Sequence, residues 1–257
     1  MFTDGFKKSD THMHPNLLRH PEQAGDFILR AIDEGFDMIC FTDHMYHPRS
    51  DAPDRMLPGR LGEYCDTVHA LAEKWASQIT LKCGIEVDYW PPDEPMIREL
   101  LAQGTFDHVI GSSHLAVEMY PYPLARMTRD ELADVCLRNT LQAAKTGLFD
   151  TVSHLDQYRW AYFHPERFPL MESEYHLEKH IPLMRQLFEY LQDTGIALEV
   201  NSYAIRKGLD PLGQPHPEDA VLRLSREYCL NYVFASDAHV ARDVGAGYAR
   251  SLEPLGL

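Results

Sequence analysis

The hydrophobic pattern of the chain alternates between two kinds of segment. Short runs rich in β-branched and aromatic residues, typical of buried strands, are separated by longer stretches with the apolar spacing of an amphipathic helix. The predicted strands lie at residues 7–14, 36–44, 79–88, 106–114, 149–154, 196–201 and 231–239. The predicted helices lie at residues 22–34, 61–77, 94–103, 128–146, 178–194 and 217–228. This alternation predicts an α/β protein with a parallel sheet.

Local signals agree with these helix boundaries. Thr128 is placed to act as an N-cap, and Gly35, Gly104, Gly147 and Gly195 follow helices as stops. Right-handed crossovers between seven parallel strands would close the sheet into a TIM-like (β/α)7 barrel, one strand short of the usual eight. No linker interrupts the pattern, so we expect one domain over residues 1–257.

Composition narrows the class of function. The chain is 44% hydrophobic, which is ordinary for a globular protein, and its formal net charge is −15. Because it also lacks a run of Lys or Arg, we do not expect nucleic-acid binding through phosphates. Five scattered cysteines without CxxC spacing indicate reduced thiols. The sequence shows no signal peptide and no apolar run of membrane-spanning length, so we expect a cytoplasmic enzyme that does not bind membranes.

Every predicted strand ends in a histidine, a carboxylate or both. The residues at or near these ends are His12, His14, Asp43, His44, Glu86, Asp88, His114, His154, Glu199, Asn201, Asp237 and His239. In a parallel barrel the carboxyl ends of the strands meet at one rim. We therefore expect these side chains to gather there, below three long connections at 45–60, 115–127 and 155–177.

Imidazole and carboxylate groups together suit zinc, manganese or iron, whereas calcium and magnesium prefer oxygen ligands. Because four ligands fill a tetrahedral site, roughly nine candidates imply two or three ions. His12 and His14 alternate along one strand and can face the same ion. Glu86 lies among apolar residues, where an uncompensated carboxylate is costly, so we expect it to bridge two ions.

The order of these motifs resembles the PHP (polymerase and histidinol phosphatase) superfamily. The motifs are THMH, FTDH, GIEVD, GSSH, SHLD, EVN and SDAH, and they extend from residue 11 to residue 239. The resemblance implies a distorted seven-stranded barrel with a trinuclear centre of zinc, manganese or iron at the carboxyl ends of the strands. Four residues would hold the first ion: His12, His14, Glu86 and Asp237. The second ion would share Glu86 and add His114 and His154. The third ion would take His44, His239 and His20, and Asp43 would either join it or orient one of its imidazoles.

Two stretches, GIEVDYW and EVNSYAIRKG, look like the histidinol-phosphate phosphatase branch of this superfamily. The resemblance assigns phosphate binding to Arg159 and Arg206. It implies hydrolysis of L-histidinol phosphate to L-histidinol and phosphate, a step of histidine biosynthesis, by a hydroxide that bridges two ions. Glu86 and Asp237 would take part in catalysis as ligands of the ions that bind this hydroxide, and Asp43 is a candidate proton donor to the leaving group.

Other interpretations stay open at this point. One is a PHP phosphoesterase that acts on a nucleotide or cyclic phosphodiester, and another is a TatD-type or amidohydrolase-like metal hydrolase. A third is a non-catalytic module that serves a polymerase or scaffold. The sequence leaves the oligomeric state open, with a homo-oligomer among the alternatives. We expect surface or packing roles for His69, His108, His176, His180 and His216, and rim-loop positions for His47 and His164. We expect hydrogen-bonding roles for Glu199 and Asn201, and we expect Asp88 and Asp156 to orient the ligands that they follow.

Overall fold

The computed structural model describes residues 7–49, 52–114, 124–164, 168, 170–208 and 210–257, and it contains the seven predicted strands. They are β1 (Ser9–Met13), β2 (Met38–Phe41), β3 (Thr80–Asp88), β4 (His108–Ser112), β5 (Thr151–Val152), β6 (Ala197–Asn201) and β7 (Tyr232–Ala235). The strands pair in sequence order, and every pair is parallel. This order is the one that successive right-handed crossovers produce.

Contacts between the first and last strands nearly close the sheet into a barrel. The amide of His14 donates to the carbonyl of Ala238 at 2.8 Å, and the amide of Asp237 donates to the carbonyl of His12 at 2.8 Å. The distorted (β/α)7 barrel predicted from sequence is therefore confirmed. These two bonds also bring the metal-ligand candidates at both ends of the chain together.

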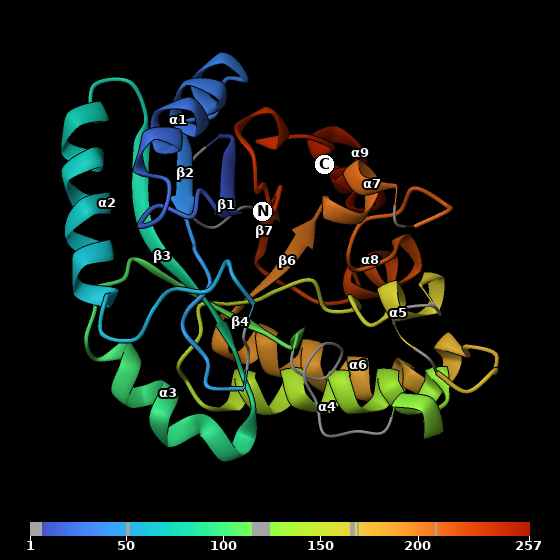
Figure 1. Cartoon of the computed structure of the whole chain (residues 1–257). Coiled ribbons are helices and arrows are strands. Elements are labelled where there is room, and N and C mark those ends of the chain that lie inside the picture. The colour runs from blue at the N-terminus through green and yellow to red at the C-terminus, as the bar shows by residue number, and fades with distance from the viewer. Residues whose placement is uncertain (1–6, 50–51, 115–123, 165–167, 169, 209) are drawn as a thin grey trace.

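Helices surround the strands (Figure 1). The longer ones are α1 (Ala24–Asp33), α2 (Leu61–Trp75), α3 (Glu94–Leu101), α4 (Arg129–Lys145), α6 (Leu177–Thr194) and α8 (Asp219–Ser225). All six match a predicted helix within a few residues. Three short helices were not predicted: α5 (Arg159–Phe163), α7 (Tyr203–Lys207) and α9 (Tyr248–Leu252). Five residues are too few to show a helical repeat in the sequence.

Two apolar clusters stabilise the barrel. One joins α1 and α2 to the first strands through residues such as Phe27, Tyr64 and Ile85, all fully buried. The other joins α4 and α6 to the later strands through residues such as Leu187 and Leu198. Burial of apolar surface is the main favourable contribution to folding, and close packing limits movement. The two clusters therefore hold the strands that carry the rim residues in fixed positions.

The caps of two helices follow the sequence signals. The Thr128 hydroxyl accepts from the amide of Glu131 at 3.2 Å, and the Glu131 carboxylate accepts from the amide of Thr128 at 2.8 Å, a reciprocal capping box. Gly195 ends α6 in the left-handed conformation at φ 78°, which glycine adopts without steric cost. In the described part of the chain, no helix has both the length and the apolar character needed to cross a bilayer.

Candidate metal centre

Four side chains from three strand ends converge on one point at the carboxyl rim. Nε2 of His12 lies 3.0 Å from Nε2 of His14 and 3.4 Å from Oε2 of Glu86. Nε2 of His14 lies 3.5 Å from the same Glu86 oxygen and 3.3 Å from Oδ1 of Asp237. Bonds of about 2.0–2.1 Å to a tetrahedral ion place its ligand atoms about 3.3 Å apart. These four separations therefore agree with those between the ligands of one such ion.

A hydrogen bond to Glu199 fixes the orientation of the His12 ring. Its Nδ1 lies 2.7 Å from Oε2 of Glu199 on β6, and both side chains are fully buried. The carboxylate accepts the Nδ1 proton, so the lone pair of Nε2 faces the other donors. The hydrogen-bonding role predicted for Glu199 is confirmed. Asn201 has a similar role, since its Nδ2 donates to Glu199 at 2.9 Å and to Asp237 at 3.2 Å.

Glu86 lies between two groups of imidazoles. Its Oε2 is 2.7 Å from Nδ1 of His44. Its other oxygen, Oε1, is 3.0 Å from Nε2 of His154 and 3.8 Å from Nε2 of His114. The side chain is 1% exposed, at the position where β3 pairs with β4. Each oxygen thus faces a different group of donors, the arrangement that a carboxylate bridging two ions needs.

Asp88 orients His114, as its position after Glu86 predicts. Its Oδ1 lies 2.8 Å from Nδ1 of His114, which leaves Nε2 of that ring directed at Glu86. The other oxygen of Asp88 forms an ion pair with Arg55, a residue of the 45–60 connection. Burial alone would raise the pKa of Asp88, but the Arg55 guanidinium and the His114 ring hold it well below its usual range.

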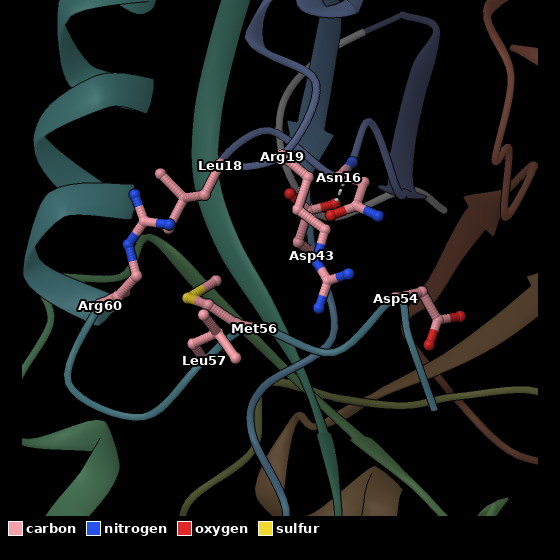
Figure 2. A pocket seen from close by; sticks show the side chains of 8 residues that line it. All are labelled: Asn16, Leu18, Arg19, Asp43, Asp54, Met56, Leu57 and Arg60. Carbon is pink, nitrogen blue, oxygen red and sulfur yellow. Dashed lines mark hydrogen bonds between the residues drawn. The ribbon is translucent and has the colours of Figure 1, made fainter. Parts of the chain in front are cut away.

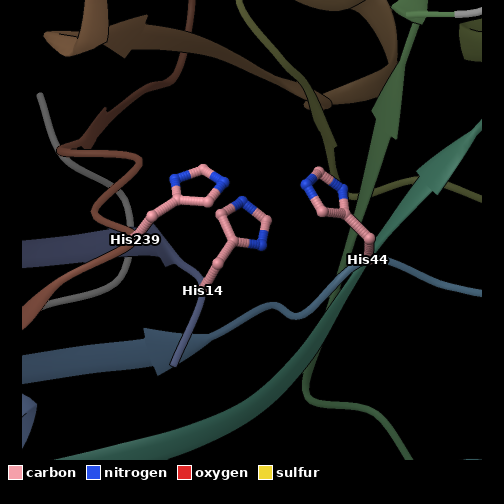
Figure 3. Close-up of side chains that lie close together, drawn as sticks. All are labelled: His14, His44 and His239. Atoms are coloured by element: carbon pink, nitrogen blue, oxygen red, sulfur yellow. The ribbon is translucent and has the colours of Figure 1, made fainter. Parts of the chain in front are cut away.

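Three histidines from separate elements form a third group (Figure 3). The ring centroids of His14 and His44 lie 4.1 Å apart, and those of His14 and His239 lie 4.5 Å apart. Burial lowers the pKa of His14, and the neighbouring rings of His44 and His239 lower it further. Burial also lowers the pKa of His239. Neutral imidazole is the form that binds metal ions, so this environment favours coordination.

The charges of the centre suit bound cations. Glu86, Asp237 and Glu199 are buried, and in the described residues none of them pairs with Lys or Arg. Burial would raise the pKa of Glu86, but the rings of His114, His12 and His44 outweigh it and hold the pKa well below its usual range. Unpaired buried carboxylates are costly, whereas divalent ions bound by carboxylate and imidazole ligands neutralise them. The residues present therefore fit divalent metal ions.

Two of the ligand candidates have unusual backbone conformations. Asp237 has φ 52° and His154 has φ 20°, values that residues with side chains rarely adopt. The positive φ of Asp237 explains why β7 ends at Ala235, short of the predicted 239. Such strain persists where the surroundings hold it, and it is frequent at functional sites.

The structure does not bring His20 into this cluster. His20 immediately precedes a 3-10 turn (Pro21–Gln23), and its side chain is 51% exposed and 3.4 Å from the Glu22 carboxylate. His20 lies in a loop after the first strand, and no pattern in the sequence shows whether such a side chain reaches the cluster. The role of His20 as a third-ion ligand stays a prediction.

Asp43 points away from the ligand groups and stabilises the loop after β1. Its two oxygens accept from the amides of Asn16 at 2.8 Å and Leu17 at 2.7 Å. It lines a separate small pocket with Arg19 and Arg60 (Figure 2). Burial raises the pKa of Asp43 to about 6, and the two amide bonds limit the rise. Its carbonyl accepts from the amide of Glu86 at 3.3 Å, but among the described residues its carboxylate forms no hydrogen bond or ion pair with a ligand candidate, so its catalytic or ligand role stays a prediction.

The two predicted phosphate arginines are engaged with acidic partners. Arg159 is 4% exposed and forms ion pairs with Asp156 at 3.1 Å and with Asp210. Arg206 forms an ion pair with Asp243 and donates to the carbonyl of Asp237 at 2.9 Å. Arg206 thus supports the loop that carries Asp237. Phosphate binding by either arginine stays a prediction.

The mouth of the centre is a pocket that the motifs did not reveal. It is lined by ligand candidates and by residues from the long connections: His44, His114, Asp237, His239, Ala52, Pro53, Asp54, Arg55, Gln157, Trp160 and Tyr203. The last seven follow strand ends at no fixed spacing, so no sequence pattern marks them. Parts of the three connections, residues 50–51, 115–123, 165–167 and 169, lie outside the described residues.

The remaining histidines and Asp156 give mixed outcomes. The packing role of His180 is confirmed, since its ring stacks on Tyr175 with centroids 5.6 Å apart. The packing role of His216 agrees with its 5% exposure, and the residue also lines a pocket with His154. Asp156 was expected to orient His154, but its Oδ1 instead lies 2.6 Å from Nδ1 of His216.

The PHP domain family matches residues 10–203, more than half of the chain, including most of these strand-end motifs. The chain belongs to the PHP domain family. It is 29% identical over 259 residues to a Deinococcus radiodurans protein named "Probable histidinol-phosphatase", covering 96% of this chain and 92% of that protein. It is 24% identical over 271 residues to the histidinol-phosphatase of Bacillus subtilis, covering 96% and 99%.

A solved structure shares the fold. The histidinol phosphate phosphatase of Lactococcus lactis, solved with zinc, L-histidinol and phosphate, superposes with a TM-score of 0.75. That comparison covers 96% of this chain and 94% of the other, at 20% sequence identity. Membership of the PHP family agrees with the motif order and favours this family over the TatD-type alternative.

Proposed function

We propose that this protein is a metal-dependent phosphomonoester hydrolase whose substrate is L-histidinol phosphate. The observation that carries the proposal is the position of Glu86, whose two oxygens face different imidazole groups inside a buried, acidic cluster. The names of the D. radiodurans and B. subtilis relatives, and the ligands of the L. lactis structure, favour this substrate among phosphomonoesters. The products would be L-histidinol and inorganic phosphate.

The centre would hold two to three divalent ions. Zinc has the most support, since the L. lactis structure contains it, while manganese and iron accept the same ligand types. His12, His14, Glu86 and Asp237 would hold one ion, and Glu86, His114 and His154 another. Bound ions of this kind lower the pKa of coordinated water and neutralise phosphate charge.

The side chains around the ligands would keep the reacting groups in place. Glu199 holds the Nδ1 proton of His12, and Asp88 holds that of His114, so that both rings keep their Nε2 lone pairs directed inward. Arg55 neutralises Asp88, which prevents this carboxylate from competing for a proton. Orientation fixed in this way removes most of the reorganisation that the reaction would otherwise need.

The pocket suits a cationic organic group attached to the phosphate. Trp160 and Tyr203 contribute aromatic side chains to its lining, and Asp54 contributes a carboxylate that is 41% exposed. Aromatic faces and a carboxylate attract a protonated amine or an imidazole ring. These residues would select the alcohol part of the substrate, while the ligand groups bind its phosphate. A single domain over residues 1–257, a cytoplasmic location and a homo-oligomer remain predictions from sequence.

Phosphate release tests the proposal directly. Zinc-loaded protein is assayed with L-histidinol phosphate, other alkyl phosphates, nucleotides and cyclic phosphodiesters. We expect the highest kcat/KM for L-histidinol phosphate and loss of turnover after chelation, reversed by added zinc. A higher kcat/KM for a nucleotide or cyclic diester would contradict the substrate and favour the phosphodiesterase alternative. Activity that persists after complete metal removal would contradict the mechanism.

A further inference from the structure

His216 lies beside the metal centre, although no strand-end motif includes it. It belongs to the loop between α7 and α8, yet its backbone is bound to the end of β6. The amide of Asn201 donates to the carbonyl of His216 at 2.7 Å, and the amide of His216 donates back at 2.9 Å. The residue is 5% exposed. A loop side chain is thus held as firmly as one on the sheet itself.

Asp156 fixes the orientation of the imidazole. Its Oδ1 lies 2.6 Å from Nδ1 of His216, and its Oδ2 accepts from the amide of Glu218 at 2.8 Å. The Arg159 guanidinium, 3.1 Å from Oδ2, holds the same carboxylate. Nδ1 therefore donates its proton to Asp156. Within the described residues, Nε2 of His216 has no hydrogen-bond partner.

The open side of this ring faces the reaction site. His216 lines a pocket with His154, Gln157, Trp160, Tyr203 and Asp237. Four of these, Gln157, Trp160, Tyr203 and Asp237, also line the mouth of the metal centre. The two pockets therefore share part of their lining, so His216 lies beside the space in which the alcohol part of an ester bound by the ligand groups would fit.

An alkyl phosphate needs a proton donor at this place. As an oxygen from water bonds to phosphorus, the bond from phosphorus to the alcohol oxygen breaks and its electron pair stays on that oxygen. An alkoxide is a poor leaving group unless a proton reaches it in the transition state. Among the residues of this pocket, His154 and Asp237 are ligand candidates, and the side chains of Gln157 and Trp160 do not titrate in water.

We propose that His216 donates its Nε2 proton to the leaving alcohol oxygen. The step forms the alcohol and inorganic phosphate and leaves a neutral ring, which regains a proton from solvent through the pocket. Asp156 holds the ring in one orientation for the transfer, as a carboxylate behind a catalytic histidine does elsewhere. This inference rests on the proposed phosphomonoesterase function and names the group that completes it. The hydroxyl of Tyr203 also lines the pocket, but histidine is the side chain type whose ordinary pKa lies near neutral pH.

Replacing the bridging oxygen of the substrate by sulfur distinguishes a proton-donating role of His216 from a structural one. Wild type and His216→Gln are assayed with the best alkyl phosphate of the panel and with its analogue that carries sulfur at the bridging position. A thiolate leaves with little need for a proton, because thiols are far more acidic than alcohols. We expect His216→Gln to lower kcat/KM on the oxygen ester about 10²- to 10⁴-fold, and on the sulfur ester less than about fivefold.

Two controls keep the test decisive. His69→Gln, on the outer face of α2, should leave both esters unchanged. Zinc content and the unfolding temperature of His216→Gln should match wild type, and His216→Asn replaces it if they do not. Equal losses on both esters, or a loss below about threefold on the oxygen ester, would overturn the inference. Absence of alkyl phosphate hydrolysis by the wild type would instead overturn the proposed function.

Discussion

The two ends of the barrel both carry carboxylates, but the acids are satisfied in opposite ways. At the amino end, a Phe-Asp pair precedes three of the strands, with acids Asp37, Asp107 and Asp150. The Asp107 carboxylate accepts from the amide of Cys83 at 2.9 Å, and the Asp107 amide donates to the carbonyl of Cys83 at 2.7 Å. Asp150 pairs with Val109 in the same way, at 2.8 Å for each bond.

At the carboxyl end, Glu86 and Asp237 differ from these acids. Both are buried, and in the described residues no backbone amide donates to either carboxylate; imidazoles lie around both, and the side-chain amide of Asn201 donates to Asp237 at 3.2 Å. The amino-end acids are exposed to solvent and bound to the adjacent strand, so each is stable alone. The comparison shows that the type of residue does not separate a structural acid from a ligand candidate. For Glu86 and Asp237 the difference is that only side chains, most of them imidazoles, reach the carboxylate.

The largest expected effect is at the carboxyl end. Glu86→Gln removes the charge that both ligand groups share, so we expect loss of at least one bound ion and a fall in kcat/KM of about 10³-fold or more. Elemental analysis and phosphate release measure the two effects. Glu189→Gln, an exposed change on α6, is the matched control. Full metal content with a normal rate would show that Glu86 does not bridge ions.

A smaller effect is expected at a residue that contacts a ligand candidate without being one. Glu199→Gln weakens the hold on the Nδ1 proton of His12 but leaves every ligand atom in place. We expect zinc affinity to fall about 10- to 100-fold, with most of the turnover restored at saturating zinc. Zinc titration of the metal-free variant, followed by phosphate release, measures both values. A variant with wild-type affinity would show that the Glu199 contact has no part in binding.

The smallest effect on activity is expected at the amino end. Asp107→Ala removes a part-buried hydrogen bond from the amide of Cys83. The free energy of unfolding should fall by about 0.5–1.5 kcal/mol, while zinc content and kcat/KM stay within about twofold of wild type. Urea unfolding of the zinc-loaded protein gives the stability, and Asp193→Ala, on the exposed side of α6, is the control. Loss of zinc from Asp107→Ala would mean that the two ends are not independent.

The sequence predicts the strands and most of their terminal residues because both depend on local patterns. Hydrophobic runs locate β1–β7, and parallel topology then brings His12, Glu86 and Asp237 to one rim without further information. The neighbours that orient them were also found where they lie on the same strands, as with Asp88 and Glu199.

Residues on connections could not be placed in this way. Asp43 follows a strand as the ligands do, but the loop of Asn16 and Leu17 captures its carboxylate. Arg55 lies between two predicted elements, and its ion pair with Asp88 depends on the path of a long connection. His216 reaches the site only because its loop returns to the end of β6. Each of these outcomes is set by tertiary contacts between segments far apart in sequence, which no local pattern records.

The most direct test of the account is reconstitution of the metal-free protein with zinc, with bound zinc and phosphate release from L-histidinol phosphate measured on the same samples. We predict that wild type binds two to three ions per chain and that activity rises with occupancy, while Glu86→Gln binds at least one ion fewer and stays inactive at saturating zinc. Full activity with one ion or fewer per chain, or equal zinc binding by wild type and Glu86→Gln, would contradict a centre built around Glu86.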